Sequence, residues 1–153
     1  CYYFENALFR EIMLWDSLAQ LLNLYYTLGK DIKKVSYKNI ITELSNKGCK
    51  EINFQEMLSY ISEKYDISDS DINKGIHGYI CDLRNQMTHR YSITITSLSE
   101  NTYLRVMPDS VYRIAKDFNT VQKYLIQIIN LIIIDINNKK MIEKIISNGI
   151  SNQ

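Results

Sequence analysis

Two long segments in which apolar residues recur every three or four positions constrain the fold of this 153-residue chain most. The first begins at Phe4 and keeps this spacing, which is the period of an α-helix, as far as Tyr25. A second apolar row accompanies the first, so we expect a helix that is buried on two sides. Gly29 supplies a stop signal just beyond it. The first row consists of Phe4, Leu8, Ile12, Trp15, Leu18, Leu22 and Tyr25, and the second of Phe9, Met13, Leu21, Leu24 and Leu28.

The second long segment begins at Pro108 and Asp109, which are typical of a helix start. Its apolar residues alternate three and four apart as in a heptad seam, and further apolar residues widen the seam enough for both core and partner contacts. Asn137 and Asn138 predict a break before a final helix over residues 139–147. The seam consists of Val111, Ile114, Phe118, Val121, Leu125, Ile128 and Ile132, and the widening residues are Tyr124, Ile129 and Ile133.

Two short helices are expected after the first long one. Ser36 can cap a helix that ends at Gly48. Asn53 and Glu56 form a variant of the capping box, which predicts a second short helix running to about Tyr65.

A further helix is expected from about Ile72 to His89, after a polar turn over residues 66–71. Gly75 and Gly78 lower its helix propensity, so we expect it to pack closely against a neighbour at these positions. Its apolar face consists of Ile72, Ile76, Ile80, Leu83 and Met87.

The apolar period changes after this helix. Apolar and polar residues alternate from Tyr91 to Thr96 as they do in a β-strand, and residues 102–107 can pair with them across a polar loop. We therefore predict a small β-hairpin at about 91–107. The expected fold class is all-α, an antiparallel helical bundle with this hairpin inserted, and the length predicts a single domain over residues 1–153.

Composition narrows the class of protein. The three cysteines are too few and too scattered for a disulfide framework, which favours a reducing, cytoplasmic setting. No apolar run reaches the roughly 18 residues of a membrane span, and we expect neither a metal nor a cofactor. A net charge of +1 does not fit a strongly electropositive nucleic-acid binder, so an RNA contact would need a local patch. The residues expected in that patch are Arg90, Arg105, Arg113 and Lys116.

Residues that can carry chemistry gather at the end of the helix predicted to finish at His89. The segment reads Arg84-Asn85-Gln86-Met87-Thr88-His89-Arg90-Tyr91. Arginine clamps phosphate with a planar fork of donors, and histidine changes its charge near neutral pH. Together these two residue types predict chemistry on a phosphodiester that needs no metal.

Helix geometry restricts how these residues can meet. Each residue turns about 100°, so Arg84 and His89 lie about 140° apart, whereas Asn85 and His89 share a face. One regular helix therefore cannot bring the arginine and the histidine into a tight site. Either the helix loosens at Thr88 and His89, or a second copy of the chain completes the site across a two-fold axis.

The segment resembles the Arg-x4-His-x-Tyr motif of the HEPN ribonucleases, the "higher eukaryotes and prokaryotes nucleotide-binding" domains. Asn85 directly follows the arginine, as in many HEPN proteins, and Tyr91 completes the longer form of the motif. The resemblance implies a homodimer in which arginine and histidine from both copies line one cleft. The long apolar helices at the two ends of the chain would supply the dimer surface.

The resemblance also implies a reaction, the cleavage of RNA by its own 2′-hydroxyl to leave a 2′,3′-cyclic phosphate and a 5′-hydroxyl. His89 is the expected base or acid, since the unperturbed pKa of histidine lies near about 6.5. Arg84 would hold the phosphate and stabilise its growing charge. Asn85 would orient His89 or the phosphate.

One further implication concerns Tyr91. In HEPN toxins paired with a nucleotidyltransferase-like antitoxin of the MNT type, the tyrosine at this position receives AMP groups and activity is lost. The leading expectation is therefore an endoribonuclease of a toxin–antitoxin or phage-defence system, with RNA as substrate and an MNT-type protein as a possible partner.

Other interpretations of the same residues stay open. Arg84 can cover the edge of a core face, His89 can favour a helix C-terminus through the helix dipole, and Tyr91 can be an ordinary strand aromatic. The chain would then be a non-catalytic, HEPN-like dimer module that binds a nucleotide or a protein.

His77 is the second histidine of the chain. It lies four residues before Cys81, a spacing that two ligands of one metal can share, but nothing nearby completes a zinc pattern, so packed side chains are the simpler interpretation. His77 also lies seven residues before Arg84 on the same helix face, which makes it a candidate RNA contact.

Overall fold

The computed structural model describes residues 2–66, 68, 70–89 and 108–150. Within these ranges the chain is all-helical, as predicted, and the predicted β-hairpin at about 91–107 lies outside the described residues. The α-helices are α1 (Tyr2–Tyr25), α2 (Tyr37–Asn46), α3 (Phe54–Ser62), α4 (Ile76–His89) and α6 (Pro108–Ile150), and a 3-10 turn, η1 (Ile32–Lys34), lies between α1 and α2.

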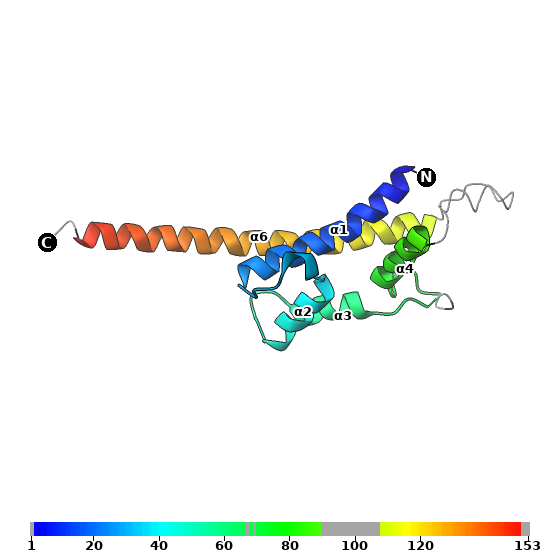
Figure 1. The fold of residues 1–153 in the computed structure, drawn as a ribbon, viewed down its shortest axis with the longest axis horizontal. Coiled ribbons are helices and arrows are strands. Elements are labelled where there is room, and N and C mark those ends of the chain that lie inside the picture. The colour runs from blue at the N-terminus through cyan, green and yellow to red at the C-terminus, as the bar shows by residue number, and fades with distance from the viewer. Residues whose placement is uncertain (1, 67, 69, 90–107, 151–153) are drawn as a thin grey trace.

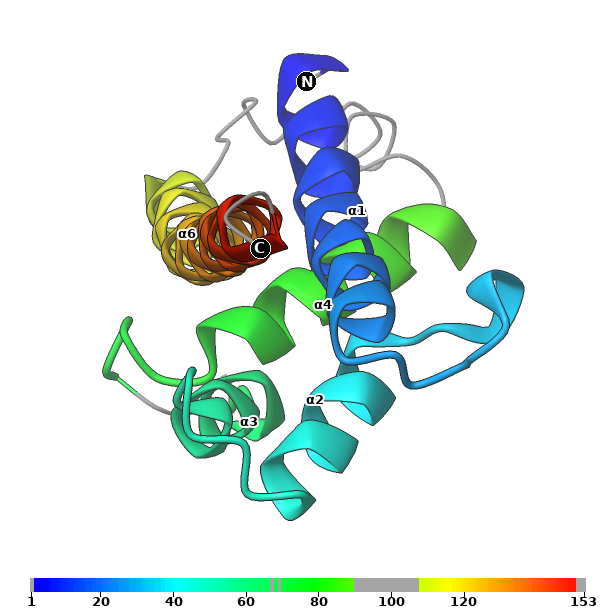
Figure 2. The same ribbon diagram turned by 90° about the vertical axis from the view of Figure 1, so that its left-hand side faces the viewer.

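The two long helices α1 and α6 lie side by side, and α4 packs against both (Figures 1 and 2). Helix α2 packs against α1, and α3 packs against α2 and α4. Trp15 contacts Asp117 and Tyr25 contacts Asp135, so α1 and α6 run in the same direction. In contrast, Tyr79 contacts Ser110 while His77 contacts Asp117, so α4 runs antiparallel to α6. The predicted antiparallel arrangement therefore holds between α4 and α6. The two longest helices, α1 and α6, are instead parallel to each other.

The main core lies where α1, α2, α3 and α6 meet, and a smaller cluster joins α1 to α4. The first apolar row of α1 is buried as predicted from Leu8 to Leu22, whereas its end residues Phe4 and Tyr25 are partly exposed. The second row is only partly covered, because Phe9, Met13 and Leu24 are 39%, 64% and 68% exposed while Leu21 and Leu28 pack against the main core. The residues of the main core are Trp15, Leu18, Ala19, Leu22, Ile40, Ile41, Leu44, Ile52, Phe54, Met57, Ile61, Val121, Tyr124 and Ile128, and those of the smaller cluster are Leu8, Ile12, Ile80 and Leu83.

The predicted apolar seam of α6 faces the core along most of its length. Val121 and Ile128 are buried and Leu125 and Ile132 pack partly buried against the main core, but Val111 and Phe118 are 51% and 45% exposed. Near the start of α6 the buried positions include polar side chains, which apolar spacing cannot reveal. These buried polar residues are Ser110, Arg113 and Asp117.

The predicted break at Asn137 and Asn138 is wrong, since α6 continues to Ile150. Asparagine lowers helix propensity by only a fraction of a kilocalorie per mole relative to good helix formers, so two exposed asparagines do not end a helix that is already propagating. In consequence the second half of α6 projects far beyond the body of the molecule (Figure 1).

The shorter helices begin and end near the predicted residues. Asn53 caps α3 by accepting from the Glu56 amide at 3.0 Å, and its own amide donates to the Glu56 carboxylate at 3.2 Å. Ser36 occupies the predicted N-cap of α2 without a side-chain hydrogen bond to the helix.

Close packing at Gly75 and Gly78 is confirmed. Gly75 has φ +56°, and a Cβ there would lie 2.5 Å from the Lys64 carbonyl oxygen; at Gly78 it would lie 3.0 Å from the Glu63 carbonyl oxygen. The left-handed backbone at Gly75 also explains why α4 begins at Ile76 and not at about residue 72.

Among the described helices, none combines the length and the apolar character that crossing a membrane requires.

Candidate active site at the end of helix α4

The predicted motif occupies the last turns of α4. Arg84 is half-buried and Asn85 is exposed, and the helix stays regular through His89. The Thr88 hydroxyl donates to the Arg84 carbonyl oxygen at 2.6 Å, one turn earlier in the same helix. Loosening at Thr88 is therefore not seen in the backbone, and the helix leaves the arginine and histidine positions on different faces. Arg90, Tyr91 and Arg105 lie outside the described residues.

Arg84 turns towards α1. Its Nε is shielded from solvent and has no hydrogen-bond acceptor in the part of the chain that the structure describes. Burial raises the pKa of Asp16 on α1, and the nearby positive charge of Arg84 offsets part of that rise. Asp16 is thus the acidic neighbour of the motif arginine. Nothing in the sequence marks it, because the two residues belong to helices far apart along the chain.

A buried polar cluster lies behind the motif, where α1, α3, α4 and α6 meet. Asp117 is fully buried and accepts from the indole Nε1 of Trp15 at 3.0 Å and from the Tyr60 hydroxyl at 2.7 Å. Nδ1 of His77 lies 3.2 Å from both of its carboxylate oxygens. A buried carboxylate needs such donors to offset the cost of leaving water.

The same cluster holds two groups with displaced pKa values. Burial alone would lower the pKa of His77, but the hydrogen bonds to Asp117 and Cys81 and the charge of Asp117 raise it to about 9. Burial and the neighbouring Asp117 raise the pKa of Glu11 to about 8, and Glu11 is only 3% exposed. The neighbouring Asp117 thus favours the protonated form of both His77 and Glu11.

His77 does not offer a surface to RNA in this structure. Its side chain is 1% exposed, and both ring nitrogens face partners inside the protein. The structure therefore places the side chain of His77 in the interior of the protein, where it cannot make the predicted contact with RNA. Apolar spacing did not show it, because His77 is a polar residue on a helix face that becomes interior.

The cluster extends outwards through Tyr37 and Cys81. The Tyr37 hydroxyl lies 2.8 Å from Nε2 of His77 and 3.4 Å from the sulfur of Cys81, and the sulfur lies 3.5 Å from the same Nε2. His77 and Cys81 are thus partners of each other. No group of three or more histidine, cysteine or acidic side chains with a metal-binding arrangement occurs among the described residues.

One member of the predicted RNA-binding patch is also interior. Arg113 is 6% exposed, donates to the Lys74 carbonyl oxygen at 2.9 Å, and lies over the rings of Tyr65 and Tyr79 at 5.2 and 5.0 Å. Such a guanidinium stabilises the packing of α6 on α4 and cannot reach phosphate. Lys116 is exposed and remains available.

A comparison with protein families decides where the chain belongs. The model of the Cthe2314-like HEPN family matches residues 1–137, which include α1 to α4 and most of α6. The chain belongs to the HEPN family. HEPN domains are helical, commonly form dimers and bind RNA, and many are ribonucleases. No curated protein and no solved structure matches the chain.

Proposed function

We propose that this HEPN protein is a metal-independent endoribonuclease that works as a homodimer. The observation that carries the proposal is the placement of the Arg-Asn-x3-His segment at the end of α4 in a chain that the family model matches over residues 1–137. The reaction would use the RNA 2′-hydroxyl as nucleophile and leave a 2′,3′-cyclic phosphate and a 5′-hydroxyl.

Arg84 supports the proposal through its unmet hydrogen-bonding capacity. A buried donor without an acceptor costs about 1–3 kcal/mol, and Nε of Arg84 has no acceptor among the described residues. A phosphate oxygen would supply one, and the guanidinium fork would then stabilise the charge that develops on phosphorus. Asp16 beside it would fix the orientation of the guanidinium.

His89 would transfer protons at the scissile bond, and Asn85 would orient it or the phosphate. Asn85 is exposed one turn before His89, on the same face of α4. Arg84 faces elsewhere, so a complete site needs Arg84 and His89 from two copies of the chain.

Exposed apolar surface on the long helices supports dimerisation. On α6, apolar side chains with 43–50% exposure recur at three- and four-residue spacing on a face turned away from the core, namely Ile126, Ile129, Ile133 and Ile136. We refer to these four residues as the α6 stripe. Phe9 and Met13 add exposed apolar surface on α1. Apolar patches of this kind mark association surfaces.

The biological setting we propose is a toxin–antitoxin or phage-defence system in the cytoplasm. Tyr91 would then be the residue through which an MNT-type partner inactivates the enzyme by adding AMP. A bulky anionic adduct two residues beyond His89 would repel the RNA phosphates.

The direct test incubates the purified protein with mixed RNA and with DNA of the same sequence, and determines the chemistry of the ends. We expect RNA fragments that carry cyclic phosphates, no cleavage of DNA, and the same rate with and without EDTA. Loss of cleavage on chelation, or cleavage of DNA, would contradict the proposed mechanism.

The second candidate is a non-catalytic module that binds a nucleotide or a protein as a dimer. The near-neutral net charge of +1 and the α6 stripe favour it, since both suit protein contacts better than RNA contacts. Intact RNA in the assay above, together with stable dimers, would favour this candidate.

A further inference from the structure

Cys81 ends a connected row of side chains that resembles the apparatus of a nucleophilic cysteine. The row runs from Asp117 to Nδ1 of His77 at 3.2 Å and from Nε2 of His77 to the sulfur of Cys81 at 3.5 Å. A carboxylate that holds an imidazole, which in turn faces a sulfur, is the arrangement that activates a nucleophile.

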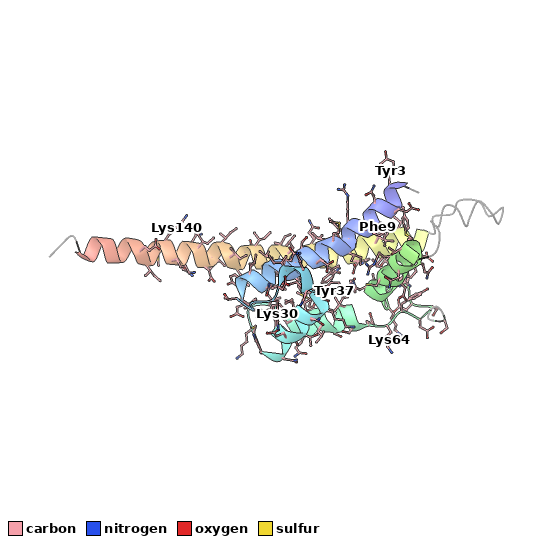
Figure 3. The ribbon with its side chains drawn as sticks, viewed as in Figure 1. Tyr3, Phe9, Lys30, Tyr37, Lys64 and Lys140 are labelled. Carbon is pink, nitrogen blue, oxygen red and sulfur yellow. The ribbon has the colours of Figure 1, made fainter. Side chains whose placement is uncertain are left out.

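A second donor faces the same sulfur. The Tyr37 hydroxyl lies 3.4 Å from the Cys81 sulfur and 2.8 Å from Nε2 of His77, so it can pass a hydrogen bond from the imidazole to the sulfur. Figure 3 places Tyr37 in the middle of the body, between α1 and the helices below it. A thiolate at Cys81 would therefore be stabilised by two donors.

The charged and titratable groups around this row come from all of the helices that pack there. They are Glu11 and Asp16 on α1, Tyr37 on α2, Tyr60 on α3, His77 on α4 and Asp117 on α6. Although burial opposes ionisation of the thiol, the hydrogen bonds from His77 and Tyr37 lower the pKa of Cys81 overall. The charge of Asp117 acts in the opposite direction but is offset by His77.

Cys81 is also reachable. It is partly exposed, unlike His77 and Asp117 behind it, and it carries no disulfide. The cluster is thus closed on its inner side and partly exposed at Cys81. A buried cysteine used only for packing would not need a charged imidazole and a carboxylate behind it.

We propose that Cys81 is a reactive thiol that forms mixed disulfides with small disulfides, activated by the His77–Asp117 pair and by Tyr37. Because His77 already carries its proton, the thiol proton passes to solvent, and the thiolate, held by donors from His77 and Tyr37, attacks one sulfur of the small disulfide. A bond forms between the Cys81 sulfur and that sulfur, the original disulfide bond breaks, and the second half leaves as a thiolate that takes up a proton. The proposal goes beyond RNA cleavage and does not depend on it.

The test compares two variants of the full chain that each keep one described cysteine. C1S/C49S keeps Cys81, and C1S/C81S keeps Cys49, which is also partly exposed. The probe is 5,5′-dithiobis(2-nitrobenzoate), an aromatic disulfide whose released half is coloured. The rate constant is measured between pH 6 and pH 8.5, and mass spectrometry of peptides locates the adduct.

An ordinary thiol, with a pKa near about 8.5, loses roughly a hundredfold in rate between pH 8.5 and pH 6. For Cys81 we expect a loss at least about threefold smaller than that of Cys49. Equal steepness in the two variants, or a Cys81 that reacts only after unfolding in urea, would overturn the proposal.

Tyr37→Phe in the C1S/C49S background tests the source of the activation. We expect the pH profile of Cys81 to become steeper, towards that of Cys49, while the circular dichroism spectrum stays unchanged. Tyr26→Phe makes the same change at a tyrosine whose ring packs against Tyr25 and Phe54, and should leave the profile as it is. A profile that stays equally shallow in Tyr37→Phe would show that this cluster is not the cause, and the proposal would fail.

Discussion

Arg84 and His89 are the residues whose loss should separate chemistry from folding. We expect Arg84→Ala and His89→Ala each to lower RNA cleavage by at least about a hundredfold, because each removes a group that acts on the phosphate or its protons. The cost to the fold should be small, since Nε of Arg84 makes no hydrogen bond among the described residues. Gel assays of RNA cleavage and thermal unfolding measure the two effects.

The matched control is Arg10→Ala, which removes an exposed arginine from α1. It should leave cleavage unchanged within about twofold, since surface charges away from such sites contribute little. Undiminished cleavage by the Arg84 or His89 variant would refute the assignment of the site.

The buried cluster predicts how stability depends on pH. The folded-state pKa of His77 is raised from 6.5 to about 9, so its contribution is fully present below pH 6.5 and is lost as the pH rises through 9. The folded-state pKa of Glu11 is raised from 4.5 to about 8, so its contribution is fully present below pH 4.5 and is lost as the pH rises through 8. The free energy of unfolding should therefore fall by several kcal/mol, on the order of 5, between pH 6 and pH 9.

Urea titrations at several pH values measure this fall. In Glu11→Gln, whose side chain stays uncharged at every pH, the fall should be smaller. The lowered pKa of Cys81 acts in the opposite direction, because its contribution to stability grows as the pH rises towards the ordinary pKa of a thiol and is fully present above it, so Cys81→Ser serves as a check. A free energy of unfolding that rises from pH 6 to pH 9 would contradict the charge state we assign to the cluster.

At the residue level, the motif was predictable and the cluster was not. Arginine and histidine at a particular spacing indicate phosphodiester chemistry wherever the fold places them. Asp117 and Glu11 carry no such signal, because each is a single acidic residue within an otherwise apolar pattern. Only the meeting of α1, α4 and α6 brings them to His77.

At the level of elements, the chain segment that joins α3 to α4 depends on one glycine. Gly75→Ala would place a Cβ 2.5 Å from the Lys64 carbonyl oxygen at φ +56°, so both the backbone and its neighbour must move. We expect a loss of at least about 2 kcal/mol in the free energy of unfolding, measured by urea denaturation.

Gly29→Ala is the matched control. Gly29 has φ +68° but nothing within 4 Å of an added Cβ, so only the backbone strain remains. This variant should lose about 1 kcal/mol. Equal losses in the two variants would show that the contact between Gly75 and Lys64 does not matter for stability.

Capping predicted the start of α3 well, because Asn53 acts within a few residues of its own position, whereas the left-handed backbone at Gly75 moved the start of α4 from the predicted residue 72 to Ile76. The face that α6 turns to the core was less predictable. Its inner side carries Ser110, Arg113 and Asp117, which are stabilised by partners on other helices. A pattern of apolar residues alone therefore could not tell Val111 and Phe118, which the structure exposes, from the seam residues that face the core.

For the whole molecule, the prediction concerns assembly. If the α6 stripe forms part of the dimer interface, Ile129→Lys with Ile133→Lys should convert a dimer into a monomer, because two charges would be buried without partners. Light scattering after size-exclusion chromatography measures the mass. RNA cleavage should fall in parallel, since the proposed site draws on two copies.

The control places the same charge on the same stretch of helix. Asn130 and Asn137 are exposed polar residues of α6, and changing both to lysine should leave the dimer intact. If the variant with Ile129→Lys and Ile133→Lys remains a dimer and cleaves RNA, the interface lies elsewhere. The exposed Phe9 and Met13 on α1 would then be the next surface to test.

Assembly is also where prediction from one sequence ends. The second apolar row of α1 and the widened seam of α6 indicated that something covers them. They did not indicate whether the cover comes from the same chain. Folding leaves Met13 64% and Ile133 50% exposed, so part of each row lies outside the core of one chain.

The projecting half of α6 has a consequence for how the protein would respond to its own concentration. Every described side chain from Ile133 to Glu143 is exposed, and Figure 3 shows Lys140 well outside the body. A helical stretch without tertiary cover is only marginally stable in water. Its amide hydrogens should exchange with deuterium quickly in dilute solution, whereas those around Ile128 exchange slowly. If exchange in the projecting half slows at higher protein concentration, its rate would report the fraction of the protein that is dimeric.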